Sequence, residues 1–252
     1  MYIKKNLIKD LIEISYNVKE GHIASSLSVL DILYVLYKDV VDFESIKNKK
    51  DDRDRVILSK GHASLGLYVI LSHFNLLSNL NRFCQFDSCL GGHPSDKIEY
   101  VESSTGSLGH GLPMGIGLAL GYKIKKFNHK IFVIIGDGES NEGSIWESAL
   151  LASHQNLNNL YCIMDYNHSS DRALKLDNIM DKFKSFNWNC LEIDGHNQEE
   201  IKKSLSINSS KPNFILANTI KGKGCKIMEN NPEWHHKTPT KEEYKLIMDE
   251  LL

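Results

Sequence analysis

Long apolar runs and an excess of basic residues are both missing from this sequence. No apolar stretch reaches 18 residues, and the first 21 residues are too polar for a signal peptide, so we expect no membrane-spanning helix and no secretion signal. The 30 Lys and Arg residues are balanced by 32 Asp and Glu residues, without any long basic run. This balance argues against nucleic acid as a partner. We therefore expect neither a membrane nor a nucleic acid partner.

Paired cysteines and a dinucleotide-binding fingerprint are also missing. The five cysteines are odd in number and form no C-x-x-C motif, which argues against a disulfide framework and against a zinc site. Reduced thiols in a cytoplasmic protein are the expected state. No G-x-G-x-x-G motif opens a helix after the first expected strand, which argues against a Rossmann dehydrogenase.

Short apolar runs alternate along the chain with segments of helical periodicity. The expected strands are 55–59, 131–135, 160–166, 190–194 and 214–219. The expected helices are 7–14, 29–37, 65–74, 111–127, 144–154, 179–186, 198–206 and a last one after the capping box of Thr240 and Glu243. This alternation predicts an α/β fold with a doubly wound, mostly parallel sheet and helices on both faces. No repeat or linker interrupts the pattern, so we expect one domain over residues 1–252.

Polar residues follow two of the expected strands, thirty positions apart. Asp137 lies in a Gly-Asp-Gly turn after the 131–135 run, and Asn167 comes directly after the 160–166 run. One helix separates these strands, so both side chains are expected at the same sheet edge, where open α/β sheets bind ligands. A carboxylate, an amide oxygen and a loop carbonyl suit Mg²⁺, or Ca²⁺, whose remaining positions are filled by phosphate oxygens and water. Alone, Gly-Asp-Gly also has the composition of a plain turn.

The motif G-D-G followed after about thirty residues by Asn resembles the cofactor fingerprint of thiamine-diphosphate enzymes. More specifically, the chain resembles the N-terminal, diphosphate-binding part of transketolase over nearly its whole length. The matching segments include, in order, EGHIASSLSVLDILYVLY, LSKGHAS, LGGHP, STGSLGHGLPMGIGLALG, GDGESNEGSIWESALLASH, DYN, DGHN, KGKG and NNPEWHHKTP.

The resemblance implies a site for thiamine diphosphate and its metal ion. Asp137, Asn167 and the backbone carbonyl of Ser169 would hold the metal. Gly136 and Gly138 flank Asp137, and Gly138 would let the backbone approach the diphosphate.

Two further segments take roles from the resemblance. One would lie along the aminopyrimidine of the cofactor and consists of Gly106, Ser107 and Leu108. Glu142 matches the acidic residue that links the two cofactor sites across the dimer of the family. The turn KGKG, at 221–224, either cradles an anion or is a solvated turn.

Four of the eleven histidines coincide with family positions that line the substrate channel or contact the diphosphate. They are His22, His62, His93 and His235. Ketol transfer moves protons on and off hydroxyl groups near neutral pH, which suits imidazole. The resemblance therefore marks all four as catalytic, and His62 and His235 also as cofactor-binding. His110 fits either this motif or the start of a helix, and His236 stands where the family often has glycine.

The resemblance covers the diphosphate half of the family and not its pyrimidine-binding domain. It implies the N-terminal subunit of a split transketolase, which transfers a two-carbon ketol unit between sugar or sugar phosphate donors and aldehyde acceptors. The partner would be a C-terminal subunit with the pyrimidine-binding domain. We expect a homodimer of this chain and a two-plus-two heterotetramer with that partner. The small residues Gly115, Gly117, Ala119 and Gly121 pack either at such an interface or on the chain's own sheet.

Two alternatives remain beside this interpretation. One is a specialised thiamine-diphosphate carboligase or lyase subunit in a surface-sugar or sulfosugar pathway. The other is a non-catalytic regulatory homologue, because Ser169 stands where the family usually has Ile or Leu, and Ala173 where it usually has Gly. The presence of both metal ligands and all four histidines favours an enzyme.

Overall fold

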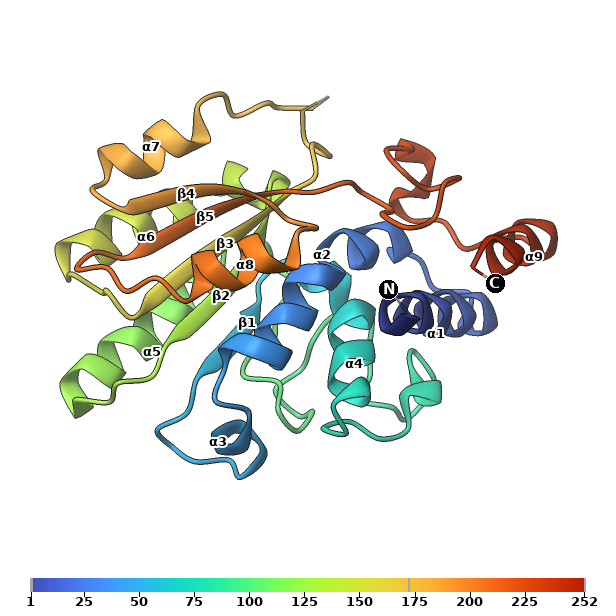
Figure 1. Ribbon diagram of the computed structural model, residues 1–252, viewed down its shortest axis with the longest axis horizontal. Helices are drawn as coiled ribbons and strands as arrows, with labels where there is room; N and C mark the ends of the chain where they lie inside the picture. Colours follow the sequence, from blue (N-terminus) through green and yellow to red (C-terminus); the bar gives the residue numbers. More distant parts are fainter. Residues whose placement is uncertain (1, 172, 252) are drawn as a thin grey trace.

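A five-stranded sheet with all strands parallel forms the centre of the computed structural model, which describes residues 2–171 and 173–251 (Figure 1). The strand order is β1-β2-β3-β5-β4. The strands are β1 (Arg55–Leu58), β2 (Ile131–Gly136), β3 (Leu160–Tyr166), β4 (Asn189–Asp194) and β5 (Asn213–Asn218). The five expected strands and their parallel arrangement are confirmed, with bounds that differ by at most one residue at either end.

Helices cover both faces of the sheet, as the doubly wound fold predicts. Their bounds are α1 (Tyr2–Val18), α2 (Ile23–Val35), α3 (Phe43–Lys47), α4 (Ser64–His73), α5 (Gly111–Lys125), α6 (Gly143–His154), α7 (Ile179–Ser185), α8 (Gln198–Leu205) and α9 (Lys241–Glu250). Alternate residues of β2 enter two separate cores: Phe132 and Ile134 pack with α2, α4 and α8, whereas Val133 and Ile135 pack with α5, α6 and α7. β2 is therefore buried on both sides, which explains its unbroken apolar sequence.

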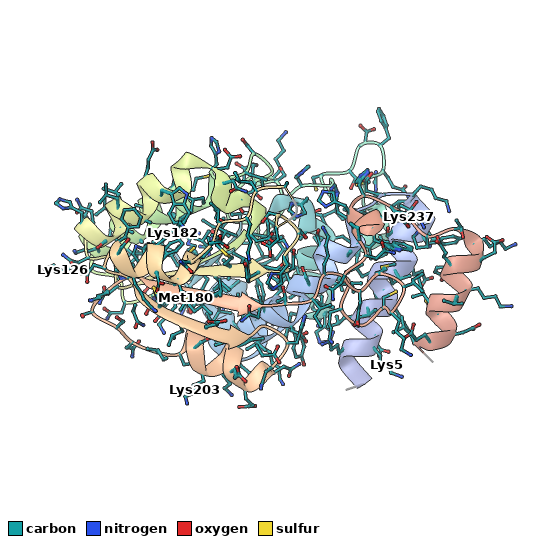
Figure 2. The ribbon with its side chains drawn as sticks, turned by 90° about the horizontal axis from the view of Figure 1, so that it is seen from above. Lys5, Lys126, Met180, Lys182, Lys203 and Lys237 are labelled. Atoms are coloured by element: carbon teal, nitrogen blue, oxygen red, sulfur yellow. The ribbon has the colours of Figure 1, made fainter. Side chains whose placement is uncertain are left out.

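The last helix lies beside the first at one end of the molecule (Figure 2). Tyr16 of α1 and Tyr244 of α9 stack with their ring centroids 4.1 Å apart. The capping box is present: Thr240 accepts from the Glu243 N–H at 3.2 Å, and the Glu243 carboxylate accepts from the Thr240 N–H at 2.9 Å. These contacts place the segment before α9 close to the start of α2 (Figure 1).

The four small residues of α5 divide between two faces of the helix. A side chain at Gly115 would collide with Cγ2 of Val133, and Ala119 is fully buried, so these two pack against the chain's own sheet. Gly117 and Gly121 have no neighbour within 4 Å of where a Cβ would lie. The helix ends at Lys125, two residues earlier than predicted, because Lys126 adopts a left-handed conformation.

Two expectations from composition can be checked on the described residues. None of their helices is both long and apolar enough to cross a membrane. All five cysteines have free thiols.

Candidate functional site

The carboxyl ends of β2, β3 and β5 meet at one edge of the sheet. Gly136 pairs with Asp165, and Tyr166 pairs with Asn218, so the residues that follow these strands are neighbours. Asp137 comes directly after β2 and Asn167 directly after β3, and both side chains are almost buried. The Ser170 N–H, in the loop after β3, donates to Oδ2 of Asp137 at 3.2 Å. The structure thus brings together the two residues that the sequence predicted to share this edge.

A buried network below the edge fixes the orientation of Asn167. Asp165 is fully buried and accepts from Lys60, Thr219 and, at 2.6 Å, Ser28. Burial alone would raise the pKa of Asp165, but the Lys60 ammonium and these hydrogen bonds outweigh it and lower that pKa. Nδ2 of Asn167 donates to the same carboxylate at 3.2 Å. Because a carboxylate only accepts, the amide nitrogen faces inward and Oδ1 faces the loop of Ser169.

The donor set at this edge fits a hard divalent cation. Oδ1 of Asn167 accepts from the Ser169 N–H at 3.1 Å, and Oδ1 of Asp137 accepts from the Gly138 N–H at 2.8 Å. The loop therefore wraps a carboxylate and an amide oxygen together, with the chain of Ser169 beside them. Such oxygen ligands suit Mg²⁺ or Ca²⁺ rather than a softer ion.

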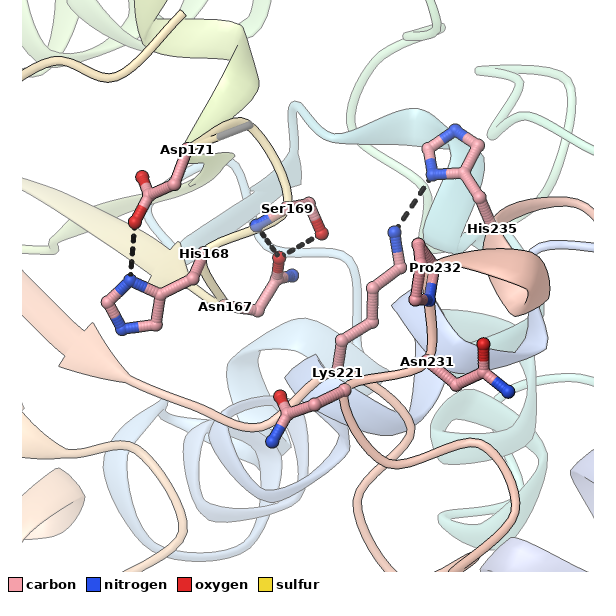
Figure 3. A pocket seen from close by; sticks show the side chains of 9 residues that line it. Asn167, His168, Ser169, Asp171, Lys221, Asn231, Pro232 and His235 are labelled. Atoms are coloured by element: carbon pink, nitrogen blue, oxygen red, sulfur yellow. Dashed lines mark hydrogen bonds and ion pairs between the residues drawn. The ribbon is translucent and has the colours of Figure 1, made fainter. Parts of the chain in front are cut away.

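A cavity of about 670 Å³ opens beside these residues (Figure 3). The loop after β3 forms one wall, and the segments after β5 form the other. The lining residues are Asn167, His168, Ser169, Asp171, Lys221, Asn230, Asn231, Pro232 and His235. His168 lines this cavity and pairs with Asp171 at 2.9 Å.

Lys221 gives the cavity a positive group. Its side chain is nearly buried, and Nζ donates to Nδ1 of His235 at 2.8 Å (Figure 3). Burial and the nearby charge of Lys60 lower the pKa of Lys221 to about 8, although Asp137 and Asp165 act in the opposite direction. Of the two sequence interpretations of the 221–224 turn, the structure therefore favours the anion cradle for its first lysine.

The backbone around Lys221 is held in place from two sides. Gly222 has φ +81°, and its N–H donates to the carbonyl of Ala24 at 2.9 Å. The Ile220 N–H donates to Nε2 of His196 at 2.8 Å, and Nδ1 of His196 therefore donates to the buried Asp31 at 2.8 Å. His196 belongs to the DGHN motif, and through these contacts it holds the Lys221 segment against α2.

Three of the four predicted catalytic histidines form a cluster. The His22 ring centroid lies 5.4 Å from that of His62 and 5.6 Å from that of His235. Burial, followed by neighbouring histidines, lowers the pKa of His22 to about 4. Burial, followed by Lys60, lowers the pKa of His62 to about 2, and burial with Lys221 lowers that of His235. All three are therefore neutral at pH 7, and Nδ1 of His235 is the nitrogen that accepts from Lys221.

His93 packs against the predicted aminopyrimidine segment. A Cβ at Gly106, whose φ is +136°, would lie only 2.8 Å from Cδ2 of His93. A Cβ at Gly61 would lie 2.8 Å from the Gly106 nitrogen. The glycines thus permit close contact between the turn after β1 and the 106–108 segment. Ser107 is exposed and Leu108 is half-buried.

Glu139 anchors this segment to the end of β2, and sequence reasoning missed it. Its buried carboxylate accepts from the Gly109 N–H at 2.9 Å, from the Gly136 N–H at 3.1 Å and from the hydroxyl of Ser59. Burial raises the pKa of Glu139, and these hydrogen bonds act against that rise. One carboxylate therefore ties three parts of the candidate site together.

Glu142, in contrast, is exposed at the N-cap of α6. A Cβ added at Gly109 would lie 2.7 Å from the Cβ of Glu142, so Glu142 lies next to the 106–109 segment. Ile124 of α5 and Leu150 of α6 are also exposed, at 73% and 60%.

His110 is the N-cap residue of α5, and its Nδ1 lies 3.1 Å from the Leu108 carbonyl oxygen.

Comparison with known proteins agrees with this geometry. The family described as "Transketolase, thiamine diphosphate binding domain" matches residues 5–251. The chain belongs to the transketolase family. It is 37% identical to an apulose-4-phosphate transketolase subunit of Phocaeicola vulgatus, a match that covers 96% of this chain and 90% of that protein. It is 34% identical to a 6-deoxy-6-sulfo-D-fructose transketolase subunit of a Clostridium species, over 92% of this chain and 88% of the relative.

Solved transketolases share the fold. The Campylobacter jejuni enzyme superposes with a TM-score of 0.87 at 30% identity and covers 98% of this chain. The Leishmania mexicana enzyme superposes with a TM-score of 0.88 at 25% identity. The chain spans only 42% and 41% of the length of these two structures. The resemblance to the thiamine-diphosphate-binding part of transketolase is therefore confirmed.

Proposed function

We propose that this chain is the cofactor-binding subunit of a two-chain transketolase. In this role it binds thiamine diphosphate with Mg²⁺, or Ca²⁺, and takes part in the transfer of a two-carbon ketol unit between sugar or sugar phosphate donors and aldehyde acceptors. The observation that carries the proposal is the arrangement around the 670 Å³ cavity. Asn167 lines one side, with Asp137 bound to the same loop through the Ser170 N–H, and Lys221 and His235 of the histidine cluster line the other.

In this proposal a divalent metal ion offsets the repulsion between the negative charges of Asp137 and the diphosphate. Asp137 and the diphosphate are both anionic, and a divalent ion coordinated by Asp137, Asn167 and the Ser169 carbonyl makes their proximity favourable. Gly136 and Gly138 leave the backbone free to approach the phosphate oxygens. Lys221 adds a second positive group that donates to the diphosphate. We expect His62 and His235, which lie near Lys60 and Lys221, to complete this binding surface.

The bound cofactor supplies the carbanion chemistry that breaks and forms the carbon–carbon bond. The protein supplies proton transfer. His22, His62 and His235 are neutral at pH 7 because their pKa values are lowered. In this proposal His22 and His62 take a proton from a donor hydroxyl on a free ring nitrogen, and His235, whose Nδ1 accepts from Lys221, donates its ring N–H to an aldehyde oxygen. His93, packed against Gly106, is placed to do the same on the side of the 106–108 segment.

A partner chain with the pyrimidine-binding domain completes the enzyme in this proposal. Two of the relatives above carry the word "subunit" in their names, and they match this chain along about nine-tenths of their length. Glu142 and the exposed apolar side chains of α5 and α6, among them Ile124 and Leu150, provide a surface for a second copy. We infer a homodimer of this chain and a two-plus-two heterotetramer with the partner, in the cytoplasm.

A specialised substrate is the second candidate. Relatives named for apulose 4-phosphate and for 6-deoxy-6-sulfo-D-fructose are covered to 90% and 88% of their length, whereas the human protein named transketolase is covered to only 38%. The relatives of matching length are thus named for particular sugars, which favours a dedicated substrate. The same site serves either substrate, because the cofactor half of the reaction is common to both.

Reconstitution tests the proposal. The chain is co-expressed with the transketolase-like gene encoded next to it, and ketol transfer is measured with thiamine diphosphate and Mg²⁺ against a panel of ketose donors, sulfosugars included. We expect activity only from the two chains together, and none when Asp137→Ala replaces the wild-type chain. Full activity of this chain by itself would refute the two-chain enzyme.

A further inference from the structure

A second group of potential metal ligands lies beside the histidine cluster. The turn between α1 and α2 carries Glu20, Gly21 and His22, and His22 takes a left-handed conformation with φ +64° at the N-cap of α2. His236 follows the short 3₁₀ helix Pro232–His235 and packs on this turn. A Cβ at Gly21 would lie 2.9 Å from Cδ2 of His236. Gly21 thus lets two distant segments of the chain meet at this point.

The geometry of this group suits a metal ion. One carboxylate oxygen of Glu20 and one ring nitrogen each of His22 and His236 lie within 4.8 Å of one another. Oε1 of Glu20 is 3.3 Å from Nε2 of His236, and the His22 and His236 ring centroids are 4.4 Å apart. Ligands around a tetrahedral Zn²⁺, with bonds of about 2.1 Å, are roughly 3.4 Å apart. One pair already has this separation, and the exposed ring of His236 is free to adjust.

We propose that Glu20, His22 and His236 form a binding site for a transition-metal ion of the Zn²⁺ class. Two imidazoles and one carboxylate are a common zinc ligand set that leaves a fourth position for water. Mg²⁺ prefers oxygen ligands, so the Asp137–Asn167 edge and this group select different ions. The sequence argues against a zinc site because it has no C-x-x-C pair, whereas the site proposed here needs no cysteine.

His22 belongs both to this group and to the histidine cluster. A metal ion bound to His22 occupies the lone pair that would accept a proton from the substrate, so the ion inhibits turnover. This consequence rests on the proposed function, whereas the metal site itself rests on geometry alone. Zn²⁺ therefore inhibits the reconstituted enzyme in the presence of excess Mg²⁺, and loss of His236 relieves that inhibition.

The direct test uses Co²⁺ as a visible probe of the site. The full chain is titrated with Co²⁺ in excess Mg²⁺, and the absorption of the bound ion is followed until Zn²⁺ displaces it. We expect one Co²⁺ per chain, with affinity reduced at least tenfold in Glu20→Gln and in His236→Gln. Glu147→Gln and His154→Gln serve as matched controls, because they remove an exposed carboxylate and an exposed imidazole of α6, outside the group.

The possible results distinguish the metal site itself from its proposed inhibitory role. The site would be overturned if Glu20→Gln and His236→Gln both bound Co²⁺ with wild-type affinity. It would also be overturned if the controls lost as much affinity as these two variants, or if the wild-type chain bound no Co²⁺. Co²⁺ binding that depends on Glu20 and His236 supports it even if the reconstituted pair shows no ketol transfer. If the pair is active, equal Zn²⁺ inhibition of wild type and His236→Gln would overturn the inhibitory role.

Discussion

Lys221 and His235 come from separate segments after β5, yet Nζ of Lys221 lies 2.8 Å from Nδ1 of His235 (Figure 3). The lysine is nearly buried and its pKa is lowered to about 8, mainly by burial. The pair therefore presents a positive donor to the cavity at pH 7 and loses this charge at mildly alkaline pH. In the proposed site this charge contributes directly to the binding of the diphosphate.

Cofactor binding should weaken as the pH rises through 8. Above that value Lys221 is neutral in the free chain, and diphosphate binding must then be accompanied by uptake of a proton. Calorimetry with thiamine diphosphate and Mg²⁺ at pH 7 and pH 9.5 should show lower affinity at the higher pH. Lys221→Met should reduce the affinity at pH 7 about tenfold or more and remove most of this pH dependence.

Lys223→Met is the matched control for this experiment. Lys223 belongs to the same turn but pairs with Glu229 at 3.8 Å and does not line the cavity. Its replacement should leave both the affinity and its pH dependence unchanged. Equal wild-type affinities at the two pH values would show that Lys221 does not bind the diphosphate as a cation.

Replacement of the clustered histidines should lower turnover. His62→Ala and His235→Ala in the reconstituted pair should each reduce kcat by about 10² or more, because each removes an imidazole proposed to exchange a proton with the substrate. His93→Ala should do the same if its place beside Gly106 is catalytic. His154→Ala, which removes the last histidine of α6, is the control and should be nearly neutral. A series in which His154 mattered and the others did not would contradict the assignment.

Glu139→Ala should destabilise the chain itself. The substitution leaves the buried N–H groups of Gly109 and Gly136 without an acceptor, which costs about 2–4 kcal/mol in the free energy of unfolding. Urea denaturation measures this loss. Glu147→Ala, at a more accessible position of α6, should leave the unfolding midpoint unchanged. A small effect of Glu139→Ala would mean that water takes over the role of the carboxylate.

The fold and the meeting of Asp137 and Asn167 at one sheet edge could be predicted from the sequence because their signals are local. The run of β2 is continuously apolar since both faces of the strand are covered, and the residues after such parallel strands meet at one edge. Asp137 and Asn167 were found in this way.

Other features depend on burial and long-range contacts that local sequence does not encode. Lys221 stands in a glycine-rich turn that is equally typical of a solvated loop, and only the contacts with Ala24 and His196 through its neighbours reveal its place. In the sequence, Glu139 cannot be distinguished from an exposed acidic residue of a turn. The sequence also could not show which small residues of α5 face the sheet. Gly115 and Gly117 lie on different faces of the helix, and only the structure shows which face meets the sheet.

The metal-dependent affinity for thiamine diphosphate tests the central claim most directly. Calorimetry compares the wild-type chain with Asp137→Ala and Asn167→Leu, with Mg²⁺ and with EDTA, while circular dichroism confirms that each variant is folded. We predict that the wild-type chain binds the cofactor, weakly without its partner, only when Mg²⁺ is present, and that both variants lose this binding. Unchanged affinity in Asp137→Ala, or wild-type affinity in EDTA, would contradict a metal–diphosphate site at this edge of the sheet.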